Sequence, residues 1–298
     1  MLLVSIPSKF TRQSMYTLLE QVIDGDLRPK STDIRFLFNE LTFIEPVGVT
    51  ILSNLIEWLN KRDVMVYMKR PSVTEDKWDP IKYLDDSMFF KKYFGETLTS
   101  NAAVRSTTIR LQQISYSDSY QWLDSNFISW LSSRLSLTKQ SLVDIKMCFG
   151  EIFNNIQDHA QQNIGCIFAQ HFPAKNIVSI AISDFGVGIP NNIKKVYNPF
   201  LNDAQALEKA VEEGFTTKST PRNRGVGLYT LIKNVVEDNG GSLHIHSNYG
   251  ILNCTMGYTV PNYKSYIADS YYPGTLLEIN IRTDQIPNIE EDEEEFEW

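Results

Sequence analysis

The segment that most constrains the fold is a helix that the apolar spacing predicts over residues 138–161. Its apolar residues recur three and four positions apart, which places them on one buried stripe made of Leu142, Ile145, Phe149, Ile152 and Ile156. Glu151, Asn155 and His159 are spaced four apart and form a second, polar stripe. A glutamate can polarise a water or hydroxyl, and an asparagine oxygen suits a hard cation such as Mg²⁺. The helix therefore indicates either a metal–phosphate site or a solvated polar face.

Two glycine-containing motifs follow this helix and favour the first alternative. The motif Asp-x-Gly-x-Gly-Ile occupies residues 184–189, directly after an apolar run at 177–182 that predicts a buried strand. The motif Arg-Gly-Val-Gly-Leu at 224–228 opens a helix predicted from Leu228 to Glu237. Glycine lets the backbone approach a ligand closely, and a helix N-terminus presents free N–H groups to phosphate. The three elements together predict a phosphate-containing ligand.

The order Glu-x-x-x-Asn, Asp-x-Gly-x-Gly-Ile, Gly-x-Gly-Leu resembles a known family. It is similar to the ATP-binding domain shared by DNA gyrase, the Hsp90 chaperone, histidine kinases and MutL, the GHKL superfamily with its Bergerat fold. Phe215-Thr-Thr-Lys resembles the ATP lid of histidine kinases, and His159, eight residues after Glu151, is spaced as in anti-sigma-factor serine kinases. The implied fold class is α+β, an α/β sandwich with a mixed, mostly antiparallel sheet and helices on one face.

The resemblance implies ATP and Mg²⁺ as ligands and assigns roles to individual residues. Asp184 would accept the adenine amino group, Asn155 would coordinate Mg²⁺, and Glu151 would be the general base. The other implied ATP contacts are Gly186, Gly188, Ile189, Thr217, Lys218, Arg224, Gly225, Val226, Gly227, Leu228 and Thr275. Simpler roles stay open for three kinds of residue. Glu151 would only order the magnesium shell, Thr275 would only pack in a strand, and the cationic lid residues such as Lys218 and Arg224 would lie in solvent.

Residues 1–97 alternate strand and helix patterns, which predicts a small α/β domain. The expected strands are 2–6, 33–38 and 64–68, and the expected helices are 10–23, 46–61 and 78–93. The segment 33–48 and its following helix resemble the STAS domain of anti-sigma-factor antagonists, with a generic α/β module as the alternative. Those proteins have Asp-Ser-Ser-Gly where this chain has Glu45-Pro-Val-Gly48, so phosphorylation at this loop is in doubt.

The rest of the chain divides around these motifs. We expect a linker at 98–117 with a strand at 104–114, the ATP-binding domain at 118–284, and an acidic, disordered tail at 285–298. Within the domain we expect a helix at 120–135 and antiparallel strands at 165–171 and 176–182 whose second face is more exposed. The excursion at 190–224, with a helix at 204–213, predicts a lid.

Composition excludes several classes of protein. Residues 290–298 carry seven acids, so removing these seven from the net charge of −8 leaves −1, and no basic nucleic-acid surface is expected. No apolar run approaches the ~20 residues that cross a bilayer. Three scattered cysteines argue against a disulfide framework and favour a cytoplasmic protein. All four histidines lie at 159 or beyond, which excludes an ordinary autophosphorylating histidine kinase.

Two functions of different classes follow from these features. The first is an anti-sigma-type protein kinase or ATPase in signalling, with Glu151 as base. The second is a nucleotide-gated interaction module with slow or no turnover, in which ATP controls docking of the STAS-like domain or of a regulatory protein partner. A homodimer is compatible with both.

Overall fold

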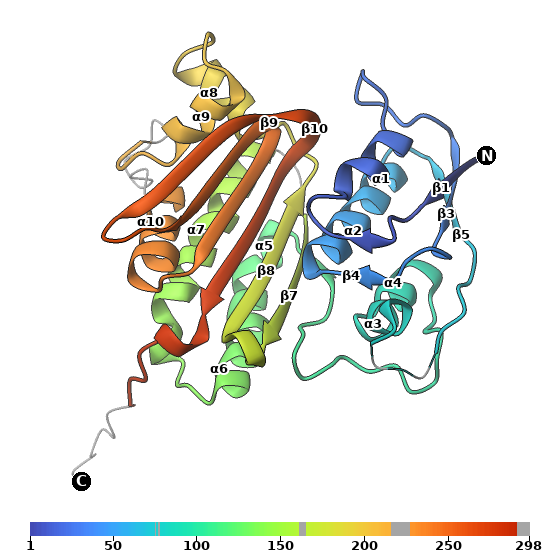
Figure 1. Ribbon diagram of the computed structural model, residues 1–298, viewed down its shortest axis with the longest axis horizontal. Helices are drawn as coiled ribbons and strands as arrows, with labels where there is room; N and C mark the ends of the chain where they lie inside the picture. Colours follow the sequence, from blue (N-terminus) through green and yellow to red (C-terminus); the bar gives the residue numbers. More distant parts are fainter. Residues whose placement is uncertain (75, 77, 161–164, 216–226, 291–298) are drawn as a thin grey trace.

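The computed structural model describes residues 1–290 except 75, 77, 161–164 and 216–226, and gives no side-chain burial for Tyr116 or for 154–160. The two larger of the three β-sheets in this part of the chain lie side by side, with a long helix between them and further helices outside the larger sheet (Figure 1). The chain is thus mixed α+β, with a large antiparallel sheet. Within the described ranges, no helix combines the length and the apolar content needed to span a bilayer.

The N-terminal layer (residues 1–97) is built on a parallel sheet of order β1-β3-β5. Its strands are β1 (Leu2–Ser5), β3 (Asp33–Leu37) and β5 (Met65–Met68), and β2 (Lys9–Phe10) pairs with β4 (Phe43–Ile44). The predicted strands are confirmed. Helix α1 (Met15–Val22) begins five residues later than expected, and α2 (Pro46–Asn60) begins at the expected proline.

Helix α2 lies at the centre of the molecule. Every residue of α2 except Glu57 and Asn60 is buried. A helix that is buried all round needs cover on all sides, and α2 has it because β7 and β8 of the larger sheet pack on the side away from the parallel sheet.

The helix expected at 78–93 is two helices, α3 (Pro80–Asp86) and α4 (Phe89–Phe94). They are separated because Met88 adopts a left-handed conformation with φ of 68°. The next segment also differs from expectation. The strand expected at 104–114 is reduced to β6 (Gln112–Gln113) and a single bridge between Thr108 and Gln170.

The larger sheet has the order β6-β7-β8-β10-β9. Its long strands are β7 (Cys166–Phe172), β8 (Ile177–Asp184), β9 (Ser242–Met256) and β10 (Pro261–Arg282). Every neighbouring pair is antiparallel, so the expected mixed sheet is wrong. The parallel pairs of this chain belong to the N-terminal layer.

Helices cover one face of this sheet. They are α5 (Tyr116–Trp122), continued by the π-helical turn η1 (Leu123–Ile128) and α6 (Ser129–Leu135), then α7 (Val143–Ala160) and α10 (Gly227–Ile232), which continues as the π-helical turn η4 (Lys233–Asp238). A 3₁₀ turn at Gln140–Leu142 precedes α7, where Thr138 Oγ1 accepts from the Ser141 N–H. The helix predicted over residues 138–161 is therefore present as α7, and a 3₁₀ turn replaces its first α-helical turn.

The second face of the sheet is buried as well, which corrects the expectation of an exposed face. Side chains alternate along β8: Val178, Ile180 and Ile182 join the core under the helices, whereas Ala181 joins the core of the N-terminal layer. Phe168, Tyr272 and Leu276 of the neighbouring strands also belong to that second core. One continuous core thus joins residues 1–97 to the back of the large sheet.

Strands β9 and β10 extend beyond the sheet as a hairpin arm (residues 249–268), which is visible at the edge of Figure 1. The pairing register shifts between Ile267 and Tyr272 and again before Thr275, so the arm bends away from the sheet. Leu252 and Cys254 then pack into the core on the helical side. Helix α9 (Asp203–Ala210), which begins with a capping box at Asn202 and Gln205, supports the arm.

Candidate functional site

Helix α7 presents Glu151 half-buried on its surface, beside the buried residues Phe149, Ile152 and Phe153. The described residues of the predicted apolar stripe, Leu142, Ile145, Phe149 and Ile152, pack in the core beneath the sheet, and the side chain of Ile156 lies outside the described residues. The side chain of Asn155 lies outside the described residues, as do those of Asn154, Asp158 and His159. The magnesium-ligand prediction thus concerns a position on a helical backbone whose side chain is not described.

Helix α10 runs antiparallel to α7. The Cys148 thiol lies 3.9 Å from the Thr230 carbonyl oxygen, and the Asn234 amide donates to the same sulfur at 2.9 Å. One turn further, Asp144 and Asp238 line a common cavity. Because the two helices run in opposite directions, the start of α10 lies toward the later turns of α7.

Gly227 is buried at the start of α10, and Leu228 packs on the helical core. The remaining predicted phosphate contacts, Thr217, Lys218, Arg224, Gly225 and Val226, lie outside the described residues.

Asp184 ends strand β8 and is 7% exposed. The strand alternation places its side chain on the helical side of the sheet, like that of Ile182. Its Oδ1 accepts a hydrogen bond from the Gly186 N–H at 2.7 Å. Burial raises the pKa of Asp184 to about 6, although the N–H groups of Gly186 and Thr275 pull the pKa down. The site therefore holds a buried carboxylate that is mostly ionised at neutral pH and keeps acceptor capacity.

Gly188 must be glycine in this geometry. Its φ is +82°, and a Cβ there would lie 2.4 Å from Asn248 Oδ1. The following residue, Ile189, starts helix α8 (Ile189–Val196), and its N–H donates to Ser247 Oγ at 2.9 Å. Ser247 Oγ in turn donates to the Gly274 carbonyl at 2.7 Å. The glycine motif is thus fixed against the two strands that follow it in the sheet.

Thr275 and Gly274 close the other side of the motif. Thr275 pairs with Asp184 across β10 and β8, and its hydroxyl lies 3.1 Å from Ser247 Oγ. Gly274 has a φ of +99°, and a Cβ there would lie 2.3 Å from the Asp184 carbonyl oxygen. Ser247 and Gly274 carry no sequence signal for this site, because their roles depend on strand register.

The structure brings the predicted residues of β8, α8 and β10 together: Asp184, Gly186, Gly188, Ile189 and Thr275. In Figure 1 the end of β8, the start of α8 and the later part of α7 lie at the same, upper end of the sheet. Glu151, Gly227 and Leu228 come from the helices on that side. Helix α8 falls within the excursion predicted as a lid, and its Lys194 forms an ion pair with Asp203.

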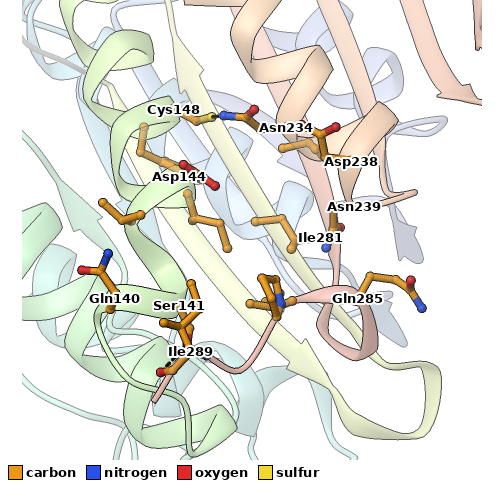
Figure 2. A pocket seen from close by; sticks show the side chains of 16 residues that line it. Gln140, Ser141, Asp144, Cys148, Asn234, Asp238, Asn239, Ile281, Gln285 and Ile289 are labelled. Carbon is orange, nitrogen blue, oxygen red and sulfur yellow. Dashed lines mark hydrogen bonds between the residues drawn. The ribbon is translucent and has the colours of Figure 1, made fainter. Parts of the chain in front are cut away.

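A cavity that is open to solvent lies near the start of α7, and none of the predicted ATP contacts lines it (Figure 2). Its lining includes Asp144, Cys148, Asn234 and Asp238, and the C-terminal segment closes it where Ser141 Oγ accepts from the Ile289 N–H. Burial raises the pKa of Cys148 to about 11, so this thiol stays protonated at neutral pH. Across the described part of the chain, no group of three or more His, Cys, Asp or Glu residues is placed to hold a metal ion.

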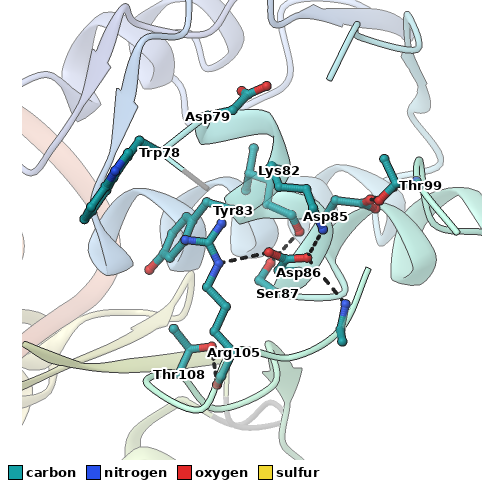
Figure 3. Close-up of polar contacts among 12 residues, drawn as sticks. Trp78, Asp79, Lys82, Tyr83, Asp85, Asp86, Ser87, Thr99, Arg105 and Thr108 are labelled. Atoms are coloured by element: carbon teal, nitrogen blue, oxygen red, sulfur yellow. Dashed lines mark hydrogen bonds and ion pairs between the residues drawn. The ribbon is translucent and has the colours of Figure 1, made fainter. Parts of the chain in front are cut away.

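A polar cluster on α3 lies outside the predicted site and explains the irregular segment that follows α4 (Figure 3). Asp85 accepts from the N–H groups of Leu98 and Thr99 at 2.8 and 3.0 Å. Asp86 pairs with Lys82 and with Arg105 Nε, at 2.5 and 2.9 Å. These bonds use the backbone and side chains of 98–105 locally, so the segment is fixed to the N-terminal layer without a strand ladder.

No protein-family model and no curated protein matches the chain. The assignment of the site therefore depends on the residues themselves.

Proposed function

We propose that this chain is a regulatory protein that binds Mg·ATP through a GHKL-type domain at residues 118–284, preceded by a STAS-like layer at 1–97. The observation that carries the proposal is Asp184. A buried carboxylate closes the central strand β8, one of its oxygens bonds Gly186, and two tightly packed glycines of positive φ, Gly188 and Gly274, surround it. This arrangement supports recognition of a flat base by a fixed acceptor.

Asp184 suits adenine better than guanine. Adenine carries an amino group where guanine carries a carbonyl oxygen, and an ionised carboxylate accepts a hydrogen bond but cannot donate one. Above its pKa of about 6 the Asp184 carboxylate would attract the amino group and repel the carbonyl. Leaving a buried polar group unpaired costs about 1–3 kcal/mol, so the expected preference for ATP over GTP is about tenfold or more.

The residues that would hold the metal and phosphates come from the later turns of α7 and from the segment before α10. Asn155 would coordinate Mg²⁺, and Lys218, Arg224, Gly225 and Val226 would contact the phosphates; their assignment rests on sequence. Magnesium, when bound, neutralises phosphate charge. The half-buried Glu151 lies four residues before Asn155 on the same helix and would act on a water or hydroxyl near that group.

Two activities are compatible with such a site. In the first, Glu151 is the general base of a serine/threonine kinase or an ATPase of the anti-sigma type. In the second, nucleotide binding gates an interaction with a regulatory partner and turnover is slow. One observation favours the second: Glu45 to Gly48 form the N-cap and first turn of α2 and pack against Phe10, where a Cβ on Gly48 would lie 2.7 Å from the Phe10 carbonyl oxygen. A segment enclosed in this way supports a docking role for the N-terminal layer rather than a phosphate-accepting one.

The test is titration of the purified protein with Mg·ATP and Mg·GTP, followed by turnover of γ-labelled ATP with label counted on protein and as free phosphate. Asp184→Asn should lose ATP affinity and the preference over GTP. Glu151→Ala should keep affinity and lose turnover. Asp144→Ala serves as the matched control, because Asp144 lies on the same helix but lines the other cavity. Wild-type protein that binds no nucleotide would refute the proposal.

A further inference from the structure

The N-terminal layer reaches the two neighbours of Asp184 in the chain. Ser183 and Phe185 point to the opposite side of β8 from Asp184, because side chains alternate along a strand. Ser183 is fully buried. Its hydroxyl accepts a hydrogen bond from the Asn54 amide of α2 at 3.1 Å and also pairs with the Tyr272 hydroxyl.

The contact on Phe185 is aromatic. The Trp58 ring of α2 meets Phe185 edge to face, with ring centroids 6.0 Å apart. On its other side Phe185 meets Tyr272, at 5.5 Å. Trp58 is itself held, since the Arg62 guanidinium lies 4.1 Å from the centroid of its ring. The Phe185 ring therefore sits between one residue of the N-terminal layer and one residue of the large sheet.

These contacts are confined to one turn of α2. Asn54 and Trp58 are four residues apart, so they lie on the same face of the helix. They contact Ser183 and Phe185, the residues on either side of Asp184. Thr50, one turn earlier, lies 3.4 Å from the Ala181 carbonyl oxygen, farther back on β8. The same helix thus offers contacts that border Asp184 and a contact that does not.

We propose that Asn54 and Trp58 are positioning residues for the nucleotide site, because they fix Asp184 through its neighbours Ser183 and Phe185. The packing of α2 against the large sheet then determines the affinity for nucleotide. This inference rests on the proposed ATP-binding function and adds its regulation. Displacement of α2 by a partner of the N-terminal layer would lower ATP affinity. Because linked equilibria are reciprocal, bound ATP would favour the packing of α2 against the large sheet by the same factor.

The first experiment is calorimetric titration of Mg·ATP and Mg·GTP into the full chain at a temperature where near-ultraviolet circular dichroism shows each variant folded. Asn54→Leu and Trp58→Leu should each weaken ATP binding about fivefold to tenfold, within the usual range of coupling between sites, and should reduce the preference for ATP over GTP. Trp58→Phe keeps a ring against Phe185 and should recover most of the affinity. Thr50→Val, the matched control, should leave both quantities unchanged.

A purely structural role predicts lower melting temperatures with wild-type affinity and wild-type base preference, and that result overturns the inference while leaving ATP binding intact. Wild-type protein that binds no ATP overturns the proposed function and this inference with it.

Should the variants not fold, hydrogen exchange of the wild type decides the question. Mg·ATP should slow exchange of the amides of α2 (46–60) as well as those at the end of β8. Protection at β8 with no change in α2 would show that the two are not coupled.

Discussion

Replacement of Asp184 by asparagine should change the pH dependence of stability in a direction that the burial of this group dictates. The pKa of Asp184 is raised from 3.8 to about 6, mainly by burial. Between these two values the native state holds a proton that the unfolded chain has released, so stability falls as pH rises through this window. Above about pH 6 both states are ionised, and the full cost of the buried charge is present.

The size of the effect follows from the two pKa values. Their separation is about 2.2 units, and each unit corresponds to 1.36 kcal/mol, so ionisation of Asp184 costs the native state about 3 kcal/mol at pH 8 relative to pH 3. Asparagine removes this cost. It also loses one of the two N–H bonds that the carboxylate accepts from Gly186 and Thr275, which costs about 1 kcal/mol at every pH. The variant should therefore be more stable than wild type at pH 8 by about 2 kcal/mol.

The assay is urea unfolding without nucleotide, followed by tryptophan fluorescence, on wild type and Asp184→Asn from pH 4.5 to 8. Other groups titrate alike in both proteins, so the difference in unfolding free energy isolates Asp184. That difference should rise with pH and level off above pH 7. Asp26→Asn, the same substitution at an exposed position, should give a flat difference. A flat difference for Asp184→Asn as well would refute the burial argument.

Three further outcomes are expected. Gly165→Ala should destabilise the fold by about 3 kcal/mol in urea unfolding, because a Cβ there would lie 1.6 Å from the Ser183 carbonyl oxygen, whereas Gly25→Ala, with open space, should be neutral. Arg12→Gln should lower the free energy of unfolding by about 2 kcal/mol at pH 7.5, because it leaves Glu278 without its cation. Burial and then Glu278 raise the pKa of Glu45, so falling pH protonates Glu45 and removes its repulsion of Glu278; the cost of the substitution should therefore shrink. An unchanged cost at pH 5 would contradict this reasoning. The three cysteines, whose pKa values burial raises to about 11 or 12, should resist iodoacetamide at pH 7.5 until urea unfolds the chain, as mass spectrometry would show.

The sequence predicts the elements of this fold better than their mutual arrangement. The period-3.6 stripe on α7 and the proline that opens α2 are local signals. Helix α2 begins at its predicted proline, whereas α7 begins at Val143, five residues after the predicted start, because a 3₁₀ turn precedes it. Pro190 is the same kind of signal for α8, but the few apolar residues of that helix make only a short stripe, so the segment is predicted as part of a long loop. The break at Met88 has no local signal, since methionine is not a residue type that favours the left-handed conformation found there.

The candidate site shows the same division. The motifs of β8 and α8 place Asp184, Gly188 and Ile189 near one another along the chain, so the sequence predicts their neighbourhood. Ser247 and Gly274 join them only through the register of three strands, which no local pattern encodes. The covered second face of the sheet had a sequence signal that can be read in retrospect: Ser179, Ala181 and Ser183 are small residues at every second position, which lets a helix approach closely.

The core that residues 1–97 share with the large sheet has a consequence for how this protein unfolds. Phe168, Tyr272 and Leu276 of the large sheet are buried by residues from the first third of the chain, and Arg12 reaches Glu278 across the same contact. Heating should therefore give one cooperative heat-absorption peak instead of two. Residues 118–284 produced alone would expose an aromatic and aliphatic surface and would tend to self-associate. The sequence pattern thus predicts a domain boundary near residue 117, whereas we expect the segments on both sides of it to unfold as one cooperative unit.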